Sequence, residues 1–425
     1  MKLEGSLFKK GIFIVILKAT GILFSYAFTL YITNFFGAKA YGQYSLFFAI
    51  INFAAILALF GTDRSVIKLY NQDELTEGRK NVIHSIFAVS LSSLIMSGLL
   101  YLGWDYLVAT FFGNSPDIIE LRPYVLILFF YSLYIFISES MRAKNKMKLF
   151  GVFRFNALFF TALLFLIFLR KAEIDWAPIK SFAFAALTIG VLGLLLFARD
   201  YGVGVKLQKA RFNKIFEISY PMLLASSMGL IIGWVDTFML GYFVDEKAVG
   251  VYNVAYKVAF VSSILLTTVT TVISPNVARL SSMDQYEELK KMIKNIAQLL
   301  SAGAALIFLL SIFNMELILS FFGKEFIVGT SALGVLLIGQ FISSYSGPVA
   351  MLLQMTGHEK NFMYISIVAM LMNVILNLLL IPAYGFLGAA IASAATLIAN
   401  NLMCVYFVKK KLGFYSFYIP FKKNA

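Results

Sequence analysis

The sequence has few of the residues on which soluble enzymes and small extracellular domains depend. Charged residues make up only 14% of its 425 positions and hydrophobic residues 60%. An average soluble domain has about 25% charged and about 45–50% apolar residues, so this composition argues strongly against a soluble enzyme. The single cysteine, Cys404, excludes an intramolecular disulfide, and the two histidines leave too few ligands for a Cys/His zinc cluster.

Two further absences limit the chemistry that the chain can perform. The sequence contains no G-x-x-x-x-G-K-[ST] phosphate loop, which excludes ATP hydrolysis of the P-loop type. No segment between its hydrophobic runs is long enough for a soluble domain. We therefore expect no catalytic residues, no metal site and no cofactor.

The chain instead contains twelve hydrophobic runs, each long enough to cross a bilayer as a helix. A bilayer core about 30 Å thick requires roughly 20 apolar residues in a helix, and the runs lack the alternating pattern of an outer-membrane barrel. They predict an all-α polytopic membrane protein with twelve transmembrane helices. The predicted spans are residues 11–32, 41–61, 83–103, 119–140, 149–169, 177–197, 215–240, 248–273, 294–313, 328–348, 361–381 and 386–408.

The net charge of +14 is distributed unevenly between the predicted loops. If the N-terminus lies in the cytoplasm, the inside segments carry 26 Lys and Arg residues and the outside loops carry 6. Cytoplasmic loops of membrane proteins show this excess of basic residues. The bias predicts that both termini are cytoplasmic, and it explains the positive charge without a nucleic-acid partner.

An internal repeat divides the chain into halves. Residues 21–44 align with residues 229–252 at a constant offset of 208, with seven of 24 positions identical. The offset corresponds to six spans, so the two copies have the same membrane orientation. Chance similarity between two apolar stretches is the alternative. The repeat predicts two pseudo-symmetric six-helix bundles, residues 1–200 and 201–425, around a central cavity, an arrangement for which a monomer is sufficient.

Four basic residues fall inside predicted spans: Lys18, Arg154, Lys180 and Lys257. Lys257 is near the midplane, where a charge costs about 2.5–3.5 kcal/mol even on a lenient insertion scale, and so is expected to face water or a partner. Lys180 is close enough to the end of its span to extend its ammonium group to the interface, and Arg154 has the same option. Lys18, Arg154 and Lys257 are the candidate binding residues, and their charge favours an anionic solute such as a phosphate or diphosphate.

Asp236 is an acidic residue near the end of a predicted span, and its role has several possible explanations. It could pair with a basic side chain, couple an ion, or be solvated at the outer end of its span, and pairing and solvation together outweigh coupling. We keep Asp236 as a candidate for ion coupling or gating, with a coupling cation as its ligand. Asn373 and Asn377 share one face of the eleventh span and are expected to form hydrogen bonds between helices.

The chain resembles the polysaccharide flippases of the MOP superfamily, which include the Wzx-type translocases of lipid-linked oligosaccharides. No single motif is specific to this family, but the ordered set of motifs is. The matching regions are residues 36–44, 220–236 with 249–252, 357–360, and 381–392. The resemblance implies two six-helix bundles that work by alternating access. It also implies that the protein lies in the bacterial cytoplasmic (inner) membrane, in contact with the membrane lipids. The implied cargo is an undecaprenyl-diphosphate-linked oligosaccharide, such as an O-antigen, capsule or exopolysaccharide repeat unit.

The resemblance also implies roles for the basic residues. Lys18, Arg154 and Lys257 would contact the diphosphate because of their place in cavity-lining helices, although no family motif matches them residue by residue. One alternative is a multidrug extruder of the same superfamily, against which stand Lys18 and the lack of any Asp or Glu in the first two spans. The other is an enzyme, a polytopic glycosyltransferase or O-antigen polymerase, but the first outer loop, residues 33–40, has no carboxylate.

Overall fold

The computed structural model describes residues 2–71, 75–113, 116–202 and 208–417. Within these ranges every regular element is helical and no strand is present, which confirms the predicted all-α class. The chain divides into two compact units, Met1–Leu230 and Ile231–Ala425. The division falls inside one long helix, and the bundles at 1–200 and 201–425 stay a prediction.

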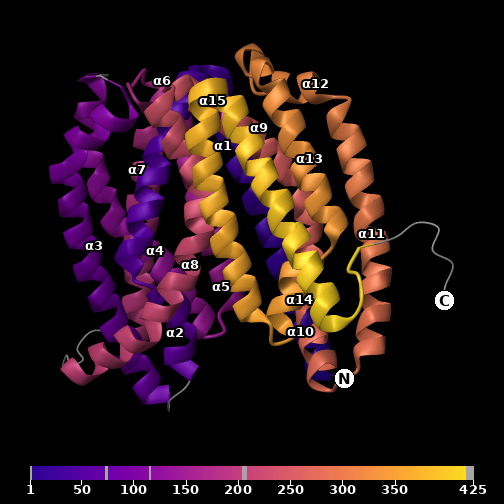
Figure 1. Ribbon diagram of the computed structural model, residues 1–425. Coiled ribbons are helices and arrows are strands. Elements are labelled where there is room, and N and C mark those ends of the chain that lie inside the picture. The colour runs from indigo at the N-terminus through magenta and orange to yellow at the C-terminus, as the bar shows by residue number, and fades with distance from the viewer. Residues whose placement is uncertain (1, 72–74, 114–115, 203–207, 418–425) are drawn as a thin grey trace. The chain divides into compact units, whose positions relative to one another are not determined.

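The first unit is built mainly from long helices (Figure 1). In this unit α4 packs against both α3 and α7, and α1 packs against α6. Large buried side chains such as Trp104, Tyr134 and Phe182 fill its core. Its elements are α1 (Lys2–Leu59), α2 (Thr62–Asn71), α3 (Leu75–Phe111), the 3-10 helix η1 (Pro116–Leu126), α4 (Ile127–Ala143), α5 (Met147–Gly151), the π-helix η2 (Val152–Ala157), α6 (Leu158–Lys171), α7 (Ala177–Tyr201) and the first part of α8 (Lys209–Phe243).

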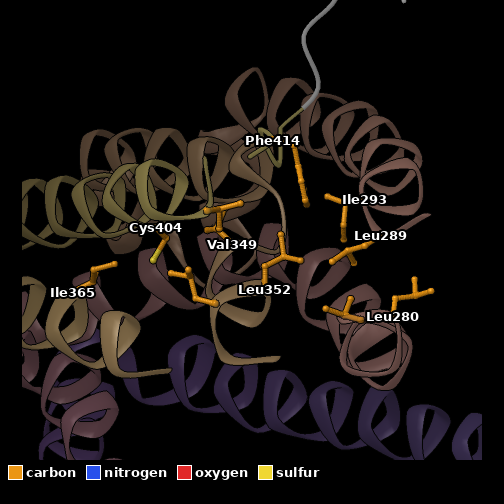
Figure 2. Close-up of a cluster of buried hydrophobic side chains, with 11 residues drawn as sticks. Leu280, Leu289, Ile293, Val349, Leu352, Ile365, Cys404 and Phe414 are labelled. Atoms are coloured by element: carbon orange, nitrogen blue, oxygen red, sulfur yellow. The ribbon is translucent and has the colours of Figure 1, made fainter. Parts of the chain in front are cut away.

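The second unit begins within α8 and continues with the helices from α9 to α15. Figure 2 shows one of its buried clusters, in which Leu289, Leu352 and Cys404 lie together where α10, α11, α14 and α15 meet. Cys404 is a buried free thiol, as a chain with one cysteine requires. The elements are α9 (Glu246–Phe260), η3 (Val261–Ser263), α10 (Ile264–Ser282), α11 (Tyr286–Ile312), α12 (Met315–Ser320), η4 (Lys324–Gly329), α13 (Thr330–Ser346), α14 (Val349–Met355) and α15 (Glu359–Leu412).

Nine helical segments of the described chain are long and apolar enough to cross a membrane. Two of them, Phe13–Asn71 and Glu359–Leu412, have 59 and 54 residues, and at about 1.5 Å per residue each is long enough for two crossings. They bend at Gly37 (φ 82°) and Gly385 (φ 54°), left-handed conformations that glycine adopts without steric cost. Since α8 covers the seventh predicted span, each of the twelve predicted spans coincides with helical structure, although spans 41–61, 294–313 and 328–348 end one or two residues beyond their helices.

The internal repeat is visible in the backbone. The first copy turns at Gly37, and the residue 208 positions later is Asp245, where the second copy turns. Asp245 is extended and its carboxylate accepts a hydrogen bond from the Ala248 backbone N–H at 2.7 Å, which caps α9. The two copies therefore break their helices at equivalent positions by different means, a glycine in one and a cap in the other.

Candidate functional site

In the first unit, Arg154 lies within the π-helix η2. This wider turn is fixed to α1 by side-chain hydrogen bonds. Asn156 donates from Nδ2 to the Leu17 carbonyl at 2.9 Å and accepts at Oδ1 from the Thr20 hydroxyl at 2.8 Å. Single π-turns inside α-helices are often found at functional sites. The π-turn sets the direction in which the Arg154 side chain projects from the helix. The hydrogen bonds to α1 fix the position of this turn.

Close backbone contact reinforces this attachment, and it gives a prediction for stability. Gly21 of α1 lies directly against the Phe155 carbonyl, so a Cβ at this position would collide with backbone atoms. We expect Gly21→Ala to destabilise the protein by about 1–3 kcal/mol, the usual cost of overpacking. Thermal unfolding of the detergent-solubilised protein measures the effect. Gly98→Ala is the matched control, because no atom lies within 4 Å of a Cβ there; equal melting temperatures for both variants would contradict the prediction.

The side chain of Arg154 belongs to a group of three charges. Its Nε lies 3.7 Å from Oε1 of Glu139, and Oε2 of Glu139 lies 3.4 Å from Nη1 of Arg142. The Tyr134 hydroxyl donates to the Arg154 backbone oxygen at 2.9 Å. Glu139 is 12% exposed, whereas the side chains of Arg142 and Arg154 are 44% and 35% exposed. One nearly buried carboxylate thus lies close to two arginines whose side chains are partly exposed.

The other predicted basic residues fall in different places. Lys18 is exposed on α1, between the residues that hold η2, so it shares the first unit with Arg154. Lys257 is half-buried on α9 of the second unit. Lys180, near the N-terminal end of α7, has its ammonium group 6.0 Å from the ring centre of Tyr124. That all three candidates contact one anionic group stays a prediction.

The second unit contains a buried acidic site at Asp236, a residue that is 3% exposed. The hydroxyls of Tyr252 (α9) and Ser393 (α15) both donate to its Oδ2, and Asn377 (α15) donates from Nδ2 to Oδ1 at 2.5 Å. Solvation at the end of the span is therefore not how Asp236 is stabilised. Among the described hydrogen-bond and ion-pair partners of Asp236 none is basic, which removes the support for a charge pair.

Two amide atoms beside this carboxylate are incompletely satisfied. Asn377 also donates to Oδ1 of Asn373 at 3.3 Å, but Oδ1 of Asn377 and Nδ2 of Asn373 are buried without a hydrogen-bond partner. Buried polar atoms of this kind call for a bound water or ion, and a buried carboxylate is stable only when it is paired or protonated. The oxygens of Asp236, Asn377 and Ser393 could hold a proton or a small hard cation.

The equivalent place in the first unit is apolar. Position 28 corresponds to Asp236 in the repeat, and Tyr44 corresponds to Tyr252. Phe28 is fully buried and meets Tyr44 edge to face, with ring centres 5.3 Å apart. The same two backbone positions therefore make an aromatic contact in one half and a hydrogen bond to a carboxylate in the other.

Several residues of these groups were missed from the sequence. Tyr252 is one of the seven positions identical between the repeat copies, which was the available signal. Ser393 stands in an alanine-rich span and gave none. Asn377 was predicted to bond between helices, and it does so, but with Asp236 as its partner on α8.

Comparison with known proteins gives matches along most of the chain. The family described as "Polysaccharide biosynthesis protein" matches residues 7–281, and the MatE family matches residues 221–379. The probable flippase AglR of Haloferax volcanii is 20% identical over 89% of this chain and 78% of its own length. The probable low-salt glycan biosynthesis flippase Agl15 of the same organism is 24% identical over 48% of this chain, a match spanning 44% of that relative.

A solved structure matches the fold. The lipid II flippase MurJ, in an inward closed conformation, superposes with a TM-score of 0.79 over 94% of this chain and 87% of its own. Sequence identity between the two is 16%, so the likeness shows a shared fold and no more.

Proposed function

We propose that the chain, which belongs to the polysaccharide biosynthesis protein family of the MOP superfamily, is a flippase that moves a lipid-linked glycan precursor across a membrane. The observation that carries this proposal is the family match over residues 7–281 of a polytopic helical protein. The relatives Agl15 and AglR, both named as probable flippases, support it.

The finer proposal concerns the cargo and its path. We infer that the cargo is an undecaprenyl-diphosphate-linked oligosaccharide, carried from the cytoplasmic to the outer leaflet of the bacterial inner membrane by alternating access. Lys18, Arg154 and Lys257 would bind its diphosphate, because basic side chains on membrane helices attract a phosphoryl anion and guanidinium groups bind it in bidentate fashion. The glycan would cross in a hydrated space while the lipid tail stays in the bilayer. Both termini would lie in the cytoplasm.

Asp236 is proposed as the site that couples transport to an ion. Its carboxylate is buried, it has hydroxyl and amide partners, and two amide atoms beside it lack partners. Binding of a proton or a small monovalent cation would neutralise the carboxylate, and a cation would also find a ligand in the unpartnered Oδ1 of Asn377. Release of the ion on the other side of the membrane would then favour the opposite conformation.

Lipid analysis of the host after deletion of the gene tests the proposed cargo. We expect an undecaprenyl-diphosphate-linked oligosaccharide to accumulate, detected by mass spectrometry of lipid extracts, while the corresponding surface glycan is lost. Reintroduction of the gene should reverse both changes. Continued display of surface glycan without accumulation of such a lipid would reject this cargo. The multidrug extruder, supported by the MatE match over residues 221–379, would then be tested by drug-sensitivity profiles.

A further inference from the structure

Arg142 and Arg154 come from the two arms of a helical hairpin. Arg142 is in the last turn of α4, and Arg154 follows α5 in η2. Between them the chain turns sharply at Asn145 (φ 58°), a left-handed conformation that asparagine tolerates. Nζ of Lys146 lies 2.6 Å from both carboxylate oxygens of Asp200 at the end of α7, which anchors the turn. The hairpin thus holds two guanidinium groups on either side of one carboxylate, that of Glu139.

The contacts of Glu139 with these groups are loose. Charge-assisted N–H···O bonds have lengths of about 2.7–2.9 Å, whereas the two distances here are 3.7 Å to Arg154 and 3.4 Å to Arg142. The side chains of both arginines are more than one third exposed, so another anion can approach this group without unfolding the hairpin. Both arginines can therefore exchange Glu139 for another anion.

The charge of this group is incompletely balanced. Glu139 supplies one negative charge for two positive ones. Asp63 of α2 also interacts electrostatically with Arg154, but it lies 3.4 Å from Arg64, which offsets its charge. A diphosphate carries more negative charge than a carboxylate and offers several oxygens, so it matches two guanidinium forks better than Glu139 does.

We propose that Arg142 and Arg154 form a docking site for the diphosphate group of the cargo, and that Glu139 occupies this site until the cargo displaces it. The inference rests on the proposed function and adds to it a second arginine and a competing carboxylate. Arg142 and Glu139 lie at the end of the fourth predicted span that the charge bias places in the cytoplasm, where a lipid-linked precursor is loaded. Dissociation of Glu139 from Arg154 is then the local structural change that accompanies loading of the cargo.

Binding of undecaprenyl diphosphate to the full-length protein in nanodiscs tests the proposal. Because Glu139→Gln removes the competing charge but keeps the shape of the side chain, we expect the Kd to fall about tenfold. Arg142→Gln should raise the Kd by about tenfold. Glu217→Gln is the matched control, since Glu217 is an exposed acid at the same predicted membrane face on α8, and its Kd should equal that of the wild type. A gain in affinity cannot result from misfolding, so Glu139→Gln separates competition from a structural role.

The outcomes that contradict the proposal are distinct from those that contradict the proposed function. If the wild type binds undecaprenyl diphosphate and the Kd is unchanged in both Glu139→Gln and Arg142→Gln, the docking site is wrong and the flippase proposal stands. If no variant and no wild-type sample binds this lipid, the proposed cargo is wrong. Inorganic pyrophosphate is the second probe. An affinity gain in Glu139→Gln for pyrophosphate but not for the lipid would assign the site to a free anion and overturn its assignment to the cargo.

Discussion

Asp236→Asn is expected to abolish ion-driven transport while the protein stays folded. The substitution keeps the shape of the side chain, and the hydroxyls of Tyr252 and Ser393 can rotate to accept hydrogen bonds from the new amide. An amide can neither take up a proton at physiological pH nor balance the charge of a bound cation. We expect gradient-driven flipping to be lost, so that the rate with an imposed gradient equals the rate without one.

Proteoliposomes with an imposed proton or sodium gradient provide the measurement. Flipping of the lipid-linked cargo should respond to one of these gradients in the wild type and to neither in Asp236→Asn. Asp284→Asn is the control, because Asp284 is an exposed acid in the turn after α10. A response to the gradient that survives in Asp236→Asn would show that this carboxylate does not couple the ion.

Lys257→Glu is expected to eliminate surface glycan while the protein still inserts and accumulates normally. Lys257 is half-buried on α9, so reversing its charge repels an anionic cargo where solvent screening is weak. The variant retains a charged side chain at this position, and other helices continue to direct insertion. Surface glycan and the amount of membrane-inserted protein are the two quantities to measure.

Two further substitutions separate the causes of the expected loss. Lys257→Met removes the attraction without adding repulsion and should give a smaller loss of export than Lys257→Glu. Lys180→Glu is the matched charge reversal, at a lysine in the first turn of α7 beside Tyr124, and this variant should keep surface glycan. Wild-type export from Lys257→Glu would remove Lys257 from the proposed binding site.

The helical content could be predicted from the sequence because the bilayer imposes it. A chain in hydrocarbon must satisfy its backbone hydrogen bonds internally, so long apolar runs become helices regardless of their detailed packing. The bends at Gly37 and Gly385 fall between adjacent predicted spans for the same reason. The turns at Gly37 and Asp245 fall at equivalent positions of the internal repeat.

The grouping of side chains could not be predicted, because it depends on how helices rotate against one another. Asp236 and Asn377 are 141 residues apart, and no periodic pattern indicates that their side chains meet. Glu139 and Arg154 are close in sequence, but their contact depends on the turn at Asn145 and on the π-helix that directs Arg154. A π-helix has no composition signal that distinguishes it from the α-helix around it.

The difference between Phe28 and Asp236 at equivalent positions has a thermodynamic consequence. The duplicated frame has a carboxylate in only one copy, so the proposed ion site at Asp236 belongs to the second unit, whereas Arg154 and its neighbours belong to the first. If an ion bound at Asp236 changes the affinity for cargo by some factor, cargo must change the affinity for the ion by the same factor. Ion titrations with and without cargo would therefore give the coupling free energy from binding equilibria alone, independently of any rate of transport.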